Sequence, residues 1–161
     1  MPQNNDILKA IATETQHISK PQFNLKTCSY DYNIEYILSL TEEKQIILEI
    51  PNKLWTTEKA SKLIKSILMN FPIPLLYLKE QQDGKWLVVD GIQRILAIFN
   101  FYKNKYELTN LEIITEFESM RFQDLPPQAK RLINLSVMHI VLIRRNSNPN
   151  IISNMVKRLN Q

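Results

Sequence analysis

The residues whose types and spacing could do chemistry lie in one short segment, Asp90 to Arg94, with the sequence DGIQR. The aromatic and β-branched run Trp86 to Val89 just before it predicts a buried strand, which Asp90-Gly91 would end. Apolar residues then recur at helical spacing from Ile92 to Tyr102. This pattern predicts a helix that starts directly after the turn and has Gln93 and Arg94 in its first turn.

A strand-to-helix turn of this kind can hold an anion, because the first N–H groups of a helix lack partners and the helix dipole is positive there. Gly91 would let a ligand approach the backbone, and the planar fork of Arg94 suits a phosphate. Asp90 would cap the helix or hold a metal ion. One glycine and one arginine are a weak motif, so these residues alone favour a plain structural turn with Arg94 as a surface charge.

Four segments predict the strands of a small mixed sheet around this turn: Ile46 to Ile50, Leu75 to Lys79, Lys85 to Val89 and Val137 to Ile143. The second and third would form a hairpin that delivers the chain to Asp90. The last has apolar residues on both faces, which predicts a central strand covered on both sides. A further short strand is expected at Tyr106 to Leu108.

Helical spacing predicts five helices, at Tyr32 to Leu40, from Thr56 or Thr57 to Leu68, from Ile92, after Asp124-Leu125-Pro126-Pro127, and after Asn148-Pro149. The polar stretch Met1 to Cys28, with Ile7, Leu8 and Ile11 at helical spacing, predicts a loose arm. We therefore expect an α+β protein with an arm at residues 1–29 and one domain at residues 30–161.

The composition, with 161 residues of which 44% are hydrophobic, fits a globular domain and excludes disorder throughout. A net charge of +4 permits binding of nucleic acid or nucleotide phosphate without requiring it. The single cysteine, Cys28, excludes an internal disulfide, and no signal pattern or membrane-length apolar run occurs. These features predict a cytoplasmic protein with no membrane partner.

Two further groups of residues have a structural and a functional interpretation. The spacing of Lys59, Lys62 and Lys65 predicts the solvated face of a helix, with a DNA or phosphate surface as the alternative. His139 has no second histidine, cysteine or carboxylate near it in sequence, which favours a structural over a catalytic histidine.

Several motifs follow one another in order after Trp55: KASKLIKSIL, FPIPLLYL, WLVVDGIQR, FQDLPPQAKR and MVKRLN. From Tyr30 to Asn160 this series resembles the N-terminal domain of the GmrSD-type modification-dependent restriction endonucleases, in the wider ParB/sulfiredoxin-like group. Spaced motifs in a fixed order are more specific than a single turn. The resemblance therefore favours the phosphate-binding interpretation of the turn.

The resemblance implies that the Asp-Gly-Gln-Gln-Arg turn of the family binds and hydrolyses a nucleoside triphosphate, which drives or licenses DNA restriction. Asp90, Gly91, Gln93 and Arg94 match this signature, and Ile92 replaces its first glutamine. By this resemblance Gly91 and Arg94 hold the phosphates, Asp90 holds Mg²⁺ and Gln93 orients the attacking water.

The chain departs from the family elsewhere. The Gln-Arg pair that the family has before the tryptophan is replaced by a shortened segment in which Lys53 offers a point charge to a phosphate. The family continues after Arg158-Leu159-Asn160, so we expect a truncated or minimal relative. The resemblance implies an HNH nuclease domain or subunit as a partner. No HNH pattern occurs in the chain itself, which predicts that this chain alone does not cleave DNA.

Two functions therefore remain open. The first is a nucleoside-triphosphate-binding domain, weakly hydrolysing with Mg²⁺, of a DNA restriction or phage-defence system. The second is a non-catalytic module that binds DNA or a protein partner and has a degenerate nucleotide site, as the changes at Ile92 and before Trp55 would allow.

Overall fold

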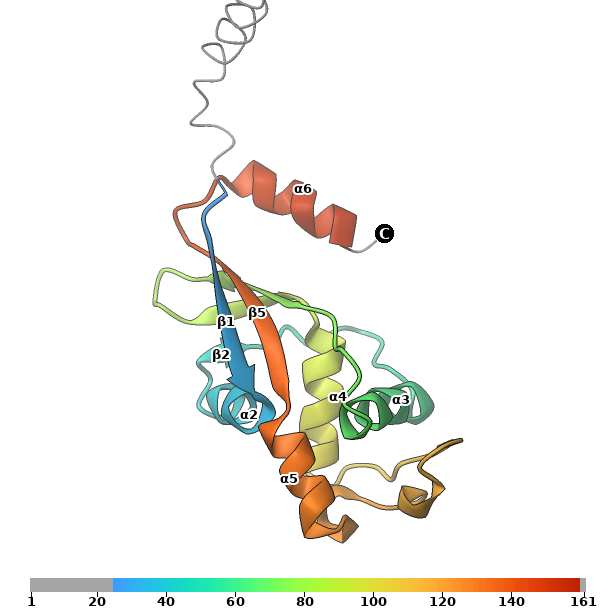
Figure 1. Ribbon diagram of the computed structural model, residues 1–161. Coiled ribbons are helices and arrows are strands. Elements are labelled where there is room, and N and C mark those ends of the chain that lie inside the picture. Colours follow the sequence, from blue (N-terminus) through green and yellow to red (C-terminus); the bar gives the residue numbers. More distant parts are fainter. Residues whose placement is uncertain (1–24, 160–161) are drawn as a thin grey trace, which may run out of the picture.

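The computed structural model describes residues 25–159, which form five α-helices and a five-stranded mixed sheet (Figure 1). This confirms the predicted α+β class. The strands are β1 (Thr27–Asn33), β2 (Ile46–Ile47), β3 (Leu76–Glu80), β4 (Trp86–Asp90) and β5 (Val137–Ile143). The predicted arm lies largely outside the described residues, and β1 occupies its last few positions.

The helices are α2 (Ile34–Glu42), α3 (Thr57–Leu68), α4 (Ile92–Tyr102), α5 (Pro127–Leu135) and α6 (Pro149–Leu159). The side chain of Asn33 caps α2 by accepting from the N–H of Tyr36, and Thr56 caps α3 by accepting from the N–H of Lys59. Proline in the first turn starts α5. The segment before α5 forms two short 3₁₀ helices, Thr115–Phe117 and Phe122–Asp124.

The strand order in the sheet is β1-β5-β3-β4-β2. The hairpin of β3 and β4 is antiparallel, as predicted, and β1 pairs antiparallel with β5. Two parallel pairings, β3 with β5 and β2 with β4, make the sheet mixed. As a result the end of β4 lies beside the start of β3, and the start of β3 lies beside β5.

The core forms between one face of the sheet and the helices. The register places Leu76, Leu78, Val88, Ile140 and Leu142 on this face, and all five are buried. Ile95, Ile98 and Phe101 of α4 are buried in the same cluster, and Figure 1 shows α4 between α2 and α3. Burial of this apolar surface fixes the start of α4 against the sheet.

Four expectations about strands are corrected. No strand was predicted at β1, because Thr27–Asn33 contains no Val, Ile, Leu or Phe. The strand predicted at Ile46 to Ile50 ends at Ile47, where its pairing with β4 stops. No strand forms at Tyr106 to Leu108. Leu108 instead accepts from the N–H of Ser119 and donates to the carbonyl of Met120.

The fourth correction concerns β5, which is interior to the sheet but is not covered on both faces. Val137 and His139, on its outer face, are exposed. The apolar residues on both faces of β5 predict burial on both sides, but at the Val137 end one face of the strand is exposed to solvent.

Within residues 25–159 no helix is long and apolar enough to cross a membrane.

Candidate functional site

The turn between β4 and α4 is built around Gly91. This residue has a φ of 98° and precedes α4, and no side chain caps the helix there. A Cβ atom at Gly91 would lie 2.3 Å from Cδ2 of Leu76 and 3.2 Å from Nη2 of Arg94. Only glycine suits both this backbone angle and this space. Asp90 does not cap the helix, which was one of the two roles the sequence allowed it.

The guanidinium of Arg94 fastens the end of β4 to the start of β3. Nη1 donates to the carbonyl of Pro74 and, at 2.9 Å, to that of Leu75. Nη2 lies 2.7 Å from Oδ2 of Asp90. The residue is only 9% exposed. The fork that suits a phosphate is thus directed mainly at three oxygens of the protein itself.

Gln93 holds the segment that carries Lys53. Its Nε2 donates to the carbonyl of Lys53 at 2.6 Å, and its Oε1 accepts from the N–H of Trp55 at 3.0 Å. The Trp55 ring lies under the ammonium of Lys59, which is 4.6 Å from the ring centroid. Two stretches 40 residues apart in sequence are thereby joined.

The structure therefore brings together the five residues that the sequence assigned to the phosphate site, and we call this place the α4 corner: Lys53, Asp90, Gly91, Gln93 and Arg94. Two charged groups of these residues have no partner among residues 25–159: the ammonium of Lys53, which is an exposed residue, and Oδ1 of Asp90. No group of three or more His, Cys, Asp or Glu side chains that could hold a metal ion occurs in this part of the chain.

A small cavity of about 200 Å³ adjoins the corner, between α3 and α4, and Trp55, Gln93 and Tyr106 help to line it. The hydroxyl of Tyr106 donates to the carbonyl of Ala97 at 2.9 Å. Burial raises the pKa of this phenol. Tyr106 is therefore a neutral structural group at every physiological pH.

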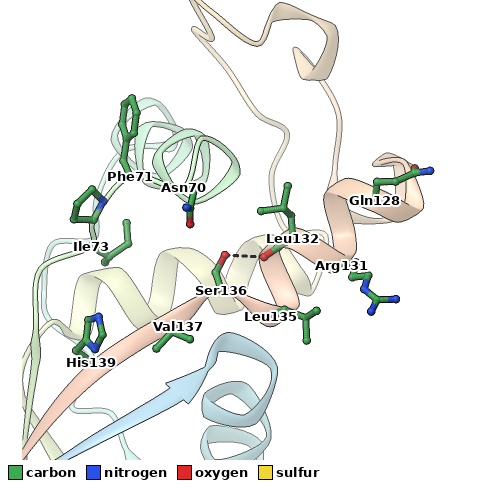
Figure 2. Close-up of a pocket in the computed structure, with 11 residues that line it drawn as sticks. Asn70, Phe71, Ile73, Gln128, Arg131, Leu132, Leu135, Ser136, Val137 and His139 are labelled. Atoms are coloured by element: carbon green, nitrogen blue, oxygen red, sulfur yellow. Dashed lines mark hydrogen bonds between the residues drawn. The ribbon is translucent and has the colours of Figure 1, made fainter.

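A second cavity, of about 710 Å³, is lined in part by residues 70–73, which directly precede the segment that Arg94 holds. Figure 2 shows it between Phe71 and Ile73 on one side and α5 with the start of β5 on the other. Phe71, Leu132, Leu135 and Val137 line it and are each more than 40% exposed. The outer face of β5 thus borders an open apolar surface.

His139 lines this cavity and has a carboxylate partner that the sequence did not suggest. Its Nδ1 lies 2.6 Å from Oδ1 of Asp31, the residue opposite it on β1. The sequence did not predict the Asp31–His139 pair because it did not predict β1. The alternation of Cys28, Tyr30 and Tyr32 with polar residues was the available signal.

A family model matches most of the chain. Residues 37–161 match the model described as the GmrSD restriction endonuclease N-terminal domain. The chain belongs to this family. The resemblance read from the motifs is confirmed, and the GmrSD N-terminal domain is a component of a restriction or phage-defence system. No curated protein and no solved structure matches the chain.

Proposed function

We propose that the α4 corner binds the triphosphate of a nucleotide and that this binding serves the restriction system of the GmrSD family. The observation that carries the proposal is the uncapped start of α4 at Gly91. The N–H groups of Ile92 and Gln93 have no hydrogen-bond partner among residues 25–159. Free N–H groups and the positive end of the helix dipole together favour an anion.

The side chains of the corner have different parts in this proposal. Gln93 fixes the backbone on both sides of Leu54 and so positions Lys53, whose ammonium is free to meet a phosphate. Asp90 would hold Mg²⁺ through Oδ1, and the ion would neutralise phosphate charge. Arg94 contributes its positive charge at close range while its hydrogen bonds keep the turn in shape.

Hydrolysis needs a water molecule oriented for attack, and Gln93 is the amide nearest to the proposed phosphate position. Its oxygen and one of its N–H groups already hold the Lys53–Trp55 segment. We therefore propose binding as the main activity and hydrolysis as a weak one.

The test is a thermal-shift titration with each of the four ribonucleoside triphosphates and Mg²⁺. Lys53→Ala is the informative variant, because Lys53 is exposed and its side chain holds nothing together. Arg94→Ala is less informative, because it also removes the hydrogen bonds that join the end of β4 to the segment before β3. We expect a rise of a few degrees in Tm that Lys53→Ala reduces.

Lys157→Ala is the matched control, since Lys157 is also exposed and lies in the last turn of α6, outside the residues of the α4 corner. It should keep the full shift. Absence of a shift with every nucleotide in the parent chain would remove the proposal.

A second function, a non-catalytic module that binds a protein partner or DNA, is favoured by a different observation. The polar side chains of the corner are largely taken up by the protein, whereas the cavity of Figure 2 exposes four large apolar side chains. The nuclease that the family description implies is the partner we propose for this surface. DNA binding that weakens with salt and ignores nucleotide would favour this alternative.

A further inference from the structure

The other end of β4 borders a small aromatic cavity that the α4 corner does not use. Its volume is about 230 Å³, and it lies between α2, the segment that follows α2 and the turn of the β3–β4 hairpin. The lining residues are Tyr32, Tyr36, Leu40, Gln45, Gly84 and Trp86. A Cβ atom at Gly84 would have nothing within 4 Å, so there is open space beside the hairpin turn.

The rings of this cavity are arranged in nearly parallel and perpendicular pairs. Tyr32 and Trp86 differ by 10° in ring plane, with centroids 6.3 Å apart. Tyr36 stands at 77° to Tyr32, with centroids 4.9 Å apart. Tyr30 extends the parallel group and lies 5.4 Å from Trp86. Flat apolar walls of this kind suit a planar ring.

The same walls carry hydrogen-bonding groups that the protein does not use. The hydroxyls of Tyr32 and Tyr36, the side-chain amide of Gln45 and the indole N–H of Trp86 have no partner among residues 25–159. The backbone around them is fixed, because Gln45 donates to the carbonyl of Leu40 at 2.8 Å and accepts from the N–H of Trp86 at 2.9 Å. These groups supply both donors and acceptors at set positions.

Core packing explains only part of this cluster. Tyr30, Tyr32 and Trp86 pack against the core with part of their surface. Tyr36 is 46% exposed, and Gln45 is also exposed. Neither the ring of Tyr36 nor the amide of Gln45 is needed to close the core, yet both line the cavity.

We propose that this cavity binds a nucleobase. A base is planar, stacks on aromatic side chains and presents donors and acceptors at its edge. A cavity of about 230 Å³ is smaller than the usual site of a drug-sized ligand, which favours a single ring system. The base comes from a single-stranded nucleic acid or from a free mononucleotide, and the experiment separates these sources.

The experiment measures fluorescence anisotropy of the full chain with three probes. These are a labelled single-stranded DNA oligonucleotide, the same oligonucleotide with abasic sites, and a labelled mononucleotide. Tyr36→Ala and Gln45→Ala are the test variants, and Ile113→Ala removes a side chain that is 63% exposed elsewhere. We expect Tyr36→Ala to weaken binding about tenfold and Ile113→Ala to leave it unchanged.

Loss of binding with the abasic probe and with Tyr36→Ala would support a base bound from nucleic acid. Binding of the labelled mononucleotide, lost with Tyr36→Ala, would support a free nucleotide as ligand. Absence of binding, or binding that is equal for the abasic probe and for Tyr36→Ala, would overturn the proposal. Tyr36→Ala should leave the triphosphate response of the α4 corner unchanged, so the two proposals fail separately.

Discussion

The two ends of β4 use their side chains in opposite ways. At Asp90 the polar groups are turned inward: Arg94 holds two carbonyls and a carboxylate, and Gln93 holds both sides of Leu54. At Trp86, aromatic rings and the unpaired side-chain amide of Gln45 line an open cavity. The residues that match the family signature are thus those that hold the chain together. At the other end, the free side chains of Tyr32, Tyr36 and Gln45 lie outside every motif that carries the resemblance.

A residue that matches a family motif therefore need not contact a ligand. A substitution at the Asp90 end should cost stability first, and a substitution at the Trp86 end should cost binding first. Four measurements test this distinction.

Arg94→Ala should have the largest effect, a loss of about 4 kcal/mol in the free energy of unfolding, because it leaves Asp90 and two carbonyls without their partner. Urea denaturation measures the loss. Arg94→Lys, which keeps the charge without the fork, should lose about half as much. A loss below about 1 kcal/mol for Arg94→Ala would show that Arg94 is not a structural fastening.

Gly91→Ala should lose about 3 kcal/mol, since it combines an unfavourable positive φ with a Cβ 2.3 Å from Leu76. Gly84→Ala is the matched control at the opposite end of β4. Its φ is 84° but a Cβ there meets nothing, so only the backbone cost of about 1 kcal/mol should remain. Equal losses in the two variants would contradict the crowding at Gly91.

Gln93→Ala should lose about 1.5 kcal/mol, because it removes two hydrogen bonds to the backbone of the Lys53–Trp55 segment. Hydrogen exchange should also accelerate at the N–H of Trp55, the group that Gln93 accepts from. Unchanged exchange at Trp55 would show that Gln93 does not hold this segment and would return it to the role of orienting water.

Tyr36→Ala should have the smallest effect on stability, about 0.5 kcal/mol, because its exposed ring loses only an edge contact with Tyr32. Thermal unfolding measures this effect beside the anisotropy assay. A loss of several kcal/mol would place Tyr36 in the core and erase the contrast between the two ends of β4.

The elements that the sequence predicted well have strong patterns. The apolar stripe of Ala60, Leu63, Ile64 and Ile67 correctly predicted α3. The hairpin of β3 and β4 was predicted from the two strand-like runs on either side of Asp83-Gly84. By contrast β1 presents Cys28, Tyr30 and Tyr32 to the core, and these residues carry little hydrophobic signal. Its assignment depends on pairing with β5, which local pattern does not contain.

The location of the α4 corner was also predictable, but the partners of its side chains were not. The motif placed Asp90, Gly91, Gln93 and Arg94 at a helix start, as the structure has them. That Arg94 meets the carbonyls of Pro74 and Leu75 depends on how β3 lies beside β4. The ParB/sulfiredoxin-like relationship, the triphosphate, Mg²⁺ and DNA remain predictions for experiment.

The pairing of β1 with β5 also bears on how the chain folds during its synthesis. Asp31 and His139 lie opposite each other in that pair and are 108 positions apart. Because the chain is synthesised from its N-terminus, β1 leaves the ribosome long before β5, the strand with which it pairs. Contacts this distant in sequence close slowly, so the step that completes the sheet should follow translation of β5 and limit the folding rate.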